Sequence, residues 1–269
     1  MRRRELAAHM QRAEAVSVGA YLSGTPRLRQ RAGDATTRID GVACLTARKV
    51  DEPFLNRALG AGTITPITAR LLDRIERHYE AAGKPPRIGI ATGFVPRAEL
   101  RILERRGYAP VGDEGVLVYT YDRARPPAPI DADGLAIERI TAKDARLYAR
   151  TGFASFRERG SGFVDVIAAL IRSGRRGIRA YLGRMDGEPA ATGMLFDVGI
   201  VGALGNGSVL PAFRGHGLQK AMIVHRMREG WSRGQRMFFG ETENPASARN
   251  MESLGWRHLY TEIDWARTS

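Results

Sequence analysis

The stretch VLPAFRGHGLQKAMIVHRMREG, residues 209–230, ends an apolar run at a proline and then begins a helical pattern. A helix N-terminus leaves backbone N–H groups without partners and carries partial positive charge. Gly215 and Gly217, just before the helix, would let those groups approach a diphosphate closely. Arg214 and Lys220 would add positive charge for the phosphate oxygens. The sequence therefore predicts a diphosphate-binding turn between a strand and a helix.

Two common nucleotide-binding loops do not fit this turn. G-x-G-x-x-G is absent because Lys220 stands where the third glycine would be, and the chain contains no G-x-x-x-x-G-K-[ST]. The pattern that fits is R-x-x-G-x-[G/A], begun by Arg214 and preceded by a V-x-P that starts at Val209. A second pattern, NPASARNMESLGW at residues 244–256, follows one predicted strand later.

Together the two patterns resemble the GNAT (GCN-related) N-acetyltransferase superfamily, over about residues 135–265. The resemblance implies transfer of an acetyl group from acetyl-CoA to a primary amine of a small molecule, by direct attack in a ternary complex. It implies no metal. The contacts to acetyl-CoA that it implies are Val209, Leu210, Arg214, Gly215, His216, Gly217, Leu218, Gln219, Lys220, Asn244 and Asn250.

The chain departs from the family's pattern at two positions. Gln219 stands where the loop usually ends in Gly or Ala, but its backbone N–H survives, so we expect phosphate binding to be tolerated. Met251, seven residues after Asn244, stands where many members carry a tyrosine that protonates the leaving thiolate. Methionine cannot donate a proton, so either no dedicated acid is needed or water takes that role.

The catalytic groups are less well defined than the loop. The resemblance implies a backbone N–H near Val209 and Leu210 that holds the developing oxyanion. A general base must also take a proton from the amine, yet the strand before the loop, IVGALGNGSV, contains no carboxylate. The candidates are Glu241 and Glu243 first, then Tyr260 and His258. Each glutamate could equally be a solvated loop residue.

Periodicity predicts the elements that position these residues, in the order β-α-α-β-β-β-α-β-α-β, a mixed α/β or α+β layer. We expect Thr141 to cap the first of these helices and 197–199 to form a strand turn. The expected elements are a strand at 135–140, helices at 141–150 and 163–173, three antiparallel strands within 177–210, a helix from Gly217 to about Arg233, a strand at 236–241, a helix at 245–254 and a strand at 256–265.

The first half repeats part of this order. A helix with Thr65 as its cap and Pro66 in its first turn precedes a strand, a helix and the strand VLVYTY. RALGAG, at 57–62, repeats the letters of the loop, but six extra residues separate its glycines from the helix, so the anion cradle should be lost. The matching spacing indicates a duplicated fold, although two unrelated α/β units stay an alternative. The expected domains are 1–122, a degenerate GNAT-like copy, the Pro-rich linker 123–134, and the catalytic domain 135–269.

Composition limits the remaining function classes. The 269 residues carry 42 Lys and Arg against 29 Asp and Glu, a net charge of +13 that favours anionic ligands. No nucleic-acid-binding signature accompanies that charge, so no nucleic-acid partner is expected. Cys44 is the only cysteine, and the 5 histidines show no ligand spacing, so neither a disulfide nor a metal site is expected.

The polar residues of the N-terminal stretch predict an amphipathic helix and not a signal peptide. No apolar run is long enough for a membrane span, so we expect a cytoplasmic protein without a membrane partner. A homodimer, a longer acyl donor and the identity of the amine are left open. The alternative function is a CoA-binding sensor or scaffold without turnover.

Overall fold

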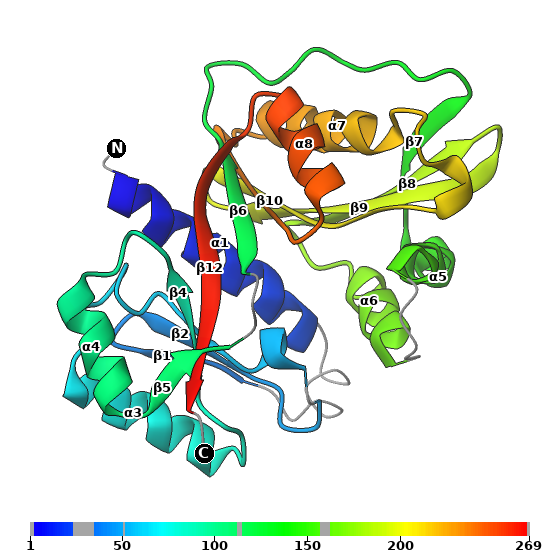
Figure 1. The fold of residues 1–269 in the computed structure, drawn as a ribbon. Helices are drawn as coiled ribbons and strands as arrows, with labels where there is room; N and C mark the ends of the chain where they lie inside the picture. Colours follow the sequence, from blue (N-terminus) through cyan, green and yellow to red (C-terminus); the bar gives the residue numbers. More distant parts are fainter. Residues whose placement is uncertain (1–2, 24–34, 51, 112–114, 157–161, 268–269) are drawn as a thin grey trace. The chain divides into compact units, whose positions relative to one another are not determined.

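The computed structural model describes residues 3–23, 35–50, 52–111, 115–156 and 162–267 (Figure 1). The chain divides into two compact units. The first comprises Met1–Val118 and Leu259–Ser269, and the second comprises Tyr119–His258. This division differs from the expected one at both ends of the second half, because the Pro-rich segment 123–134 belongs to the second unit and the end of the chain belongs to the first.

The first unit is built on a sheet with the strand order β1-β2-β3-β4-β12, and β5 also pairs with β12. Its strands pair antiparallel except β3 and β4, which are parallel. Its elements are α1 (Arg3–Ser23), β1 (Ala35–Ile39), β2 (Val42–Thr46), the short helix η1 (Pro53–Leu55), β3 (Ala58–Leu59), α3 (Ala69–Ala81), β4 (Arg87–Ala91), α4 (Arg97–Arg105), β5 (Tyr108–Pro110) and residues 259–267 of β12 (Arg257–Arg267).

Helices cover both faces of this sheet, as the side chains of β2 show. Val42 and Cys44 belong to a core cluster that contains α3. Ala43 and Leu45 belong to a second cluster with α1. Successive side chains of a strand point to opposite faces, so α1 and α3 lie on opposite sides of the sheet. Most positions of α1 are buried, which is more than the single apolar face that an amphipathic helix buries.

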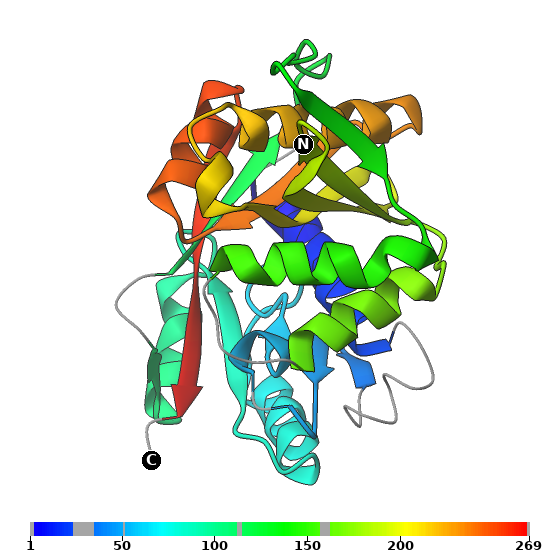
Figure 2. The ribbon, with the colours of Figure 1, turned by 90° about the vertical axis from the view of Figure 1, so that its right-hand side faces the viewer.

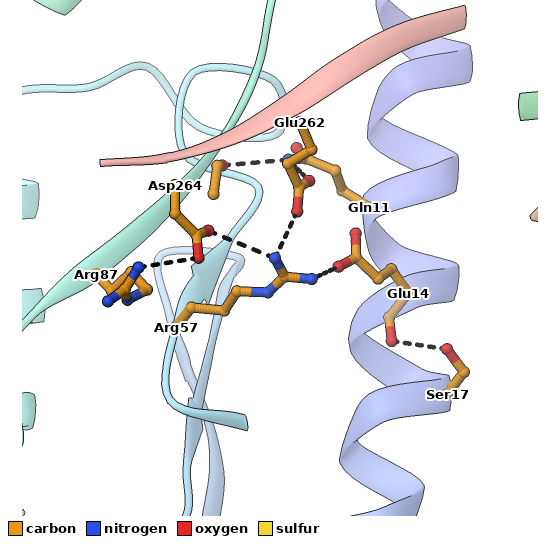
Figure 3. Close-up of polar contacts among 8 residues, drawn as sticks. Gln11, Glu14, Ser17, Arg57, Arg87, Glu262 and Asp264 are labelled. Atoms are coloured by element: carbon orange, nitrogen blue, oxygen red, sulfur yellow. Dashed lines mark hydrogen bonds and ion pairs between the residues drawn. The ribbon is translucent and has the colours of Figure 1, made fainter. Parts of the chain in front are cut away.

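A buried ionic network fastens β12 into the first unit (Figure 3). Arg57 pairs with Glu14 of α1 and, through Nη1, lies 3.1 Å from Glu262 and 3.4 Å from Asp264 of β12. Gln11 Nε2 donates to Glu262 Oε2 at 3.0 Å. Buried charges are tolerated when they are paired and hydrogen-bonded. The network therefore fixes the position of the last strand against α1 and the start of β3.

The second unit is built on a sheet with the order β6-β11-β10-β9-β8-β7. β7 to β10 pair antiparallel, whereas β10 and β11 are parallel. In Figures 1 and 2, α7 lies on one side of β8, β9 and β10, with α5 and α6 on the other. Its elements are residues 119–121 of β6 (Val116–Tyr121), β7 (Leu135–Arg139), α5 (Ala145–Phe156), α6 (Gly162–Arg172), β8 (Ile178–Met185), β9 (Glu188–Val198), β10 (Val201–Val209), α7 (Leu218–Ser232), β11 (Met237–Thr242) and α8 (Pro245–Ser253).

The strand beside each parallel pair comes from the other half of the sequence. β12, the last strand of the chain, lies beside β4 in the first unit. β6, which ends the first half, lies beside β11 in the second. Tyr121 of β6 packs there against Phe238, with ring centroids 6.5 Å apart, and against Trp256, at 5.9 Å. This exchange explains why the last residues of the chain belong to the first unit.

The predicted start of the helix after RALGAG is wrong by one turn. α3 is capped by Thr68, whose hydroxyl accepts from the backbone N–H of Leu71 at 3.1 Å. Thr65 instead closes the preceding loop, where its carbonyl accepts from the amide of Gly62 at 2.7 Å. The residues between Thr65 and Thr68 therefore belong to the loop, although the pattern assigns them to the helix.

Two further local predictions are also wrong. The side chain of Thr141 caps nothing, because the short helix η2 (Ala142–Asp144) separates it from α5. The turn between β9 and β10 is Gly199–Ile200 and not 197–199. Asp197 stays in β9, where it forms an ion pair with Arg179. The carboxylate of Asp197 thus pairs with Arg179 instead of forming the turn.

Candidate functional site

The loop between β10 and α7 has the conformation that its glycines predict. After Val209 the chain makes one short turn, η3 (Pro211–Phe213), and then runs through two glycines into α7. Gly215 has φ +89° and Gly217, the N-cap, has φ +76°, in the left-handed region that favours glycine. A Cβ built on either glycine would meet nothing within 4 Å. The glycines thus turn the chain and leave the surface of the loop open.

The first turn of α7 offers backbone donors. Its first backbone hydrogen bond runs from Ala221 to the carbonyl of Gly217, at 3.1 Å. No acceptor among the described residues meets the amides of Leu218, Gln219 or Lys220. These amides lie at the positive end of a 15-residue helix. The loop can therefore hold an anion by backbone groups alone.

Arg214 holds the loop in place by hydrogen bonds, in addition to giving it positive charge. Its Nε donates to the carbonyl of Val209 at 3.3 Å, and its Nη2 donates to the carbonyl of Ser155, in α5, at 3.1 Å. These bonds join the end of β10, the loop and α5. The guanidinium therefore has a fixed place beside the loop, a role that the sequence does not predict.

The two sequence motifs meet through Gln219. Its Nε2 donates to Ser247 Oγ at 2.8 Å, and its Oε1 accepts from Asn250 Nδ2 at 2.6 Å. Asn244 caps α8, because its Oδ1 accepts from the amides of Ala246, at 2.8 Å, and Ser247, at 3.3 Å. The structure thus brings Gln219 and Asn250 together, and it engages the side-chain oxygen of Asn244 within α8.

β10 and β11 are paired over only four residues. Their register runs from Val201↔Met237 to Leu204↔Gly240. An extra residue then interrupts β10 between Gly205 and Ser208, and Asn206 within it has φ +49°. Such a bulge bends its strand and ends local pairing. Beyond it, β10 stays paired with β9 alone in the observed register.

Of the two predicted oxyanion donors, only Val209 has its N–H facing the parted strands. The amide of Leu210 donates to the carbonyl of Ala190, in β9, at 2.9 Å. Neighbouring residues in a strand direct their N–H groups to opposite edges. The N–H of Val209 therefore points away from β9, toward the side where pairing with β11 has ended.

Glu241 and Glu243 lie near the same edge. Glu241 follows Gly240, the last residue of β11 paired with β10, and its side chain is exposed. Strand alternation places it on the sheet face opposite to Gly240. Glu243 is also exposed and lies between β11 and α8.

Tyr260 and His258 both lie in β12. Tyr260 belongs to the first unit, where it is buried with its ring 5.9 Å from that of Phe94. His258 lies at the end of the second unit with its ring 5.6 Å from that of Tyr119.

Met251 is a core residue of the second unit. It is buried, and a Cβ on Gly240 would lie 2.6 Å from its Cε. Trp256 flanks the same glycine, 3.4 Å from that Cβ position. The side chain of Met251 thus packs against β11.

The corresponding loop of the first unit is filled by its own side chains. A Cβ on Gly60 would lie 2.6 Å from Ile64 Cδ1, and one on Gly62 would lie 2.6 Å from Val95 Cγ2. The open surface found at Gly215 and Gly217 has no counterpart here.

The start of α3 also has internal partners. The amide of Ile67 donates to Glu99 Oε2 at 2.6 Å, and the amide of Leu71 donates to Thr68 Oγ1 at 3.1 Å. Ile67 precedes the cap Thr68, so the Glu99 carboxylate lies just before the helix, while the cap accepts from Leu71 in the first turn. The loss of the anion cradle stays a prediction, which the filled surface at Gly60 and Gly62 favours.

A groove of about 450 Å³ lies elsewhere in the second unit. It runs between 129–132, β7 and the side of α7 that carries His225 and Glu229. It shares only Ala221 with the first turn of α7, so we do not assign it to the loop site. Across the described residues, no three His, Cys, Asp or Glu side chains are placed to hold a metal ion. None of the helices in the described ranges could cross a bilayer.

Comparisons with known proteins identify the fold. No protein-family model and no curated protein matches the chain. A GCN5-related N-acetyltransferase from Kribbella flavida is 16% identical, with a TM-score of 0.67 over 95% of each chain. A tandem GNAT protein from the clavulanic acid biosynthesis pathway is 15% identical, with a TM-score of 0.59 over 78% of this chain and 74% of its own. The predicted fold class, a mixed α/β fold with a mostly antiparallel sheet, is confirmed, and the duplication of one unit stays a prediction.

Proposed function

We propose that the chain is an acetyl-CoA-dependent N-acetyltransferase that acetylates a primary amine of a small molecule. The observation that carries the proposal is that one continuous segment holds both groups of backbone donors. The N–H of Val209 faces the parted strands, and nine residues later the open amides of α7 begin at Leu218. The fold, which is that of GNAT proteins, supports the same assignment.

The loop residues would bind the diphosphate. The amides of Leu218, Gln219 and Lys220 would donate to its oxygens, and Gly217 gives the approach without a side chain in the way. Lys220 and His216 would add side-chain donors at the rim. The bound cosubstrate would supply an activated thioester.

The residues around the parted strands would assist the transfer. The N–H of Val209 would stabilise negative charge that develops on the thioester oxygen. Glu241 is the proposed base, because it lies just past the last β10–β11 pair and is exposed to solvent. Met251 donates no proton, so water would protonate the leaving thiolate.

A thiol-release assay tests this proposal. Wild type, Glu241→Gln and Glu243→Gln are incubated with acetyl-CoA and a panel of primary amines. We expect release with at least one amine, a loss of about 100-fold in kcat for Glu241→Gln, and near wild-type kcat for its neighbour Glu243→Gln. Wild-type rates at both positions would reject the assignment of the base.

The second candidate, a CoA-binding sensor without turnover, is favoured by one observation. Met251 is packed into the core where the family carries a proton donor, and β10 contains no carboxylate. Tight acetyl-CoA binding without thiol release for any amine would support the sensor.

A further inference from the structure

Arg226 is a buried cation in the middle of α7. Its exposed fraction is 3%, and none of the described carboxylates forms an ion pair with it. Burial lowers the pKa of its guanidinium to about 10. A charge placed in such surroundings is tolerated only when it is well hydrogen-bonded. The hydrogen-bond partners of this guanidinium therefore indicate what Arg226 does in the fold.

The partners are three backbone carbonyls on three elements. Nη1 donates to Met194 of β9 at 3.0 Å and to Gly205 of β10 at 3.2 Å, and Nε donates to Met222 of α7 itself at 2.9 Å. One guanidinium thus joins the helix that carries the loop amides to the strand that carries Val209.

A glycine of β9 makes room for this side chain. A Cβ on Gly193 would lie 2.7 Å from the guanidinium carbon, and one on Gly207 would lie 3.5 Å from Nη2. Gly193 has no left-handed φ, so this position uses the missing side chain, whereas a Cβ on Gly207 would make an ordinary van der Waals contact. Glycine within a strand often marks such a close approach.

The bond to Gly205 falls where β10 leaves β11. Gly205 directly follows Leu204, the last residue paired with β11, and directly precedes the bulge. Within the bulge, the carbonyl of Asn206 accepts from Thr192 Oγ1 at 3.1 Å. Because Thr192 and Gly193 are neighbours in β9, their Cβ directions point to opposite sheet faces. The bulge is therefore held from both faces.

We propose that Arg226 is a positioning residue for acetyl transfer. By holding the carbonyl of Gly205, it sets the bulge, and the bulge sets the direction of the Val209 N–H. Since Arg226 belongs to α7, it also fixes that N–H relative to the amides at the start of the helix. This inference rests on the proposed function and adds a residue that contacts neither the diphosphate nor the thioester.

The test uses acetyl-CoA labelled with ¹³C at the acetyl carbonyl, so it needs no amine. Calorimetry gives the Kd, and NMR gives the carbonyl shift of the bound form, which moves downfield when an N–H donates to the oxygen. The variants are Arg226→Met, Gly193→Ala and the double variant. Arg228→Met, at an exposed contact to the carbonyl of Pro127, is the control.

We expect each single variant to bind within threefold of the wild-type Kd and to lose the downfield shift. In the double variant, the methyl added by Gly193→Ala has no guanidinium to displace. The double variant should therefore have the same Kd and the same carbonyl shift as Arg226→Met. With any amine that is turned over, kcat should fall at least 100-fold while the KM for acetyl-CoA is unchanged. Arg228→Met should match wild type in every measurement.

The results distinguish a failure of this inference from a failure of the proposed function. Bound variants that keep the wild-type shift overturn this inference alone, whereas a wild type that binds no acetyl-CoA overturns the proposed function and this inference with it. If Arg226→Met does not fold, Gly193→Ala decides, because it displaces the guanidinium while retaining the charge.

Discussion

Gln219 accepts a hydrogen bond from Asn250 Nδ2 at 2.6 Å, which ties the first turn of α7 to α8. The residue that departs from the family's pattern is therefore an internal link, and its backbone N–H stays open. The side chain and the amide of one residue can thus be separated experimentally.

Replacing Gln219 by alanine should lower the free energy of unfolding by about 1–2 kcal/mol, because it removes two hydrogen bonds. The Kd for CoA should stay within threefold, since the amide remains. Gln219→Glu should weaken CoA binding at least tenfold by placing a negative charge beside the diphosphate. Urea unfolding and calorimetry measure the two effects. Equal losses of binding in both variants would contradict binding by the amide.

Breaking the buried network of the first unit should cost much more stability. Arg57→Met removes the cation that faces Glu14, Glu262 and Asp264, which leaves an excess of negative charge in the buried network. We expect a loss of about 3–5 kcal/mol in the free energy of unfolding. Arg74→Met is the matched control, because Arg74 and its partner Asp40 are 39% and 46% exposed, and it should cost less than about 1 kcal/mol. Similar losses for the two variants would refute the role of the network.

Placing a tyrosine at position 251 should not increase thiol release. Met251 packs against Gly240 and Trp256, so Met251→Tyr must displace buried neighbours and should destabilise the chain by about 1–3 kcal/mol. Its kcat should not exceed that of wild type, while Met251→Leu should be nearly neutral in both respects. A gain in thiol release for Met251→Tyr would show that the side chain reaches the thiolate.

Alkaline pH should destabilise the protein. Burial raises the pKa of the Cys44 thiol to about 12, and burial with the nearby Glu252 raises that of Tyr119 to about 12. A raised folded-state pKa means that the folded state holds its proton more tightly, so this stability is complete below about pH 9 and is lost toward pH 12. Urea unfolding between pH 8 and 11 should show the decline, with a shallower slope for Cys44→Ala. An unchanged free energy of unfolding across that range would contradict the prediction.

The sequence predicts the loop well because its geometry is local. Gly215 and Gly217 have the backbone angles that the pattern implies, and α7 begins within one residue of its predicted start. The exchange of β6 and β12 could not be predicted, because strand periodicity does not name a partner more than a hundred residues away.

The buried position of Arg226 could not be predicted from the sequence either, because an arginine in a helix is most often solvated. Its buried position depends on Gly193, a strand glycine that marks a close approach but does not identify the approaching group. The same holds for Gln219, whose partners Ser247 and Asn250 become visible only when α8 packs beside α7.

The central claim is that the loop before α7 holds the diphosphate of acetyl-CoA, and calorimetric titration of three proteins tests it directly. Gly217→Trp fills the open surface at the start of α7, while Gly234→Trp makes the same change just past its end. Gly234 has φ +98° and, like Gly217, has nothing within 4 Å of its Cβ position, so the two variants carry comparable strain. We predict one-site binding for wild type and Gly234→Trp and its loss in Gly217→Trp. Undiminished binding by Gly217→Trp, or no binding by wild type, would contradict the claim.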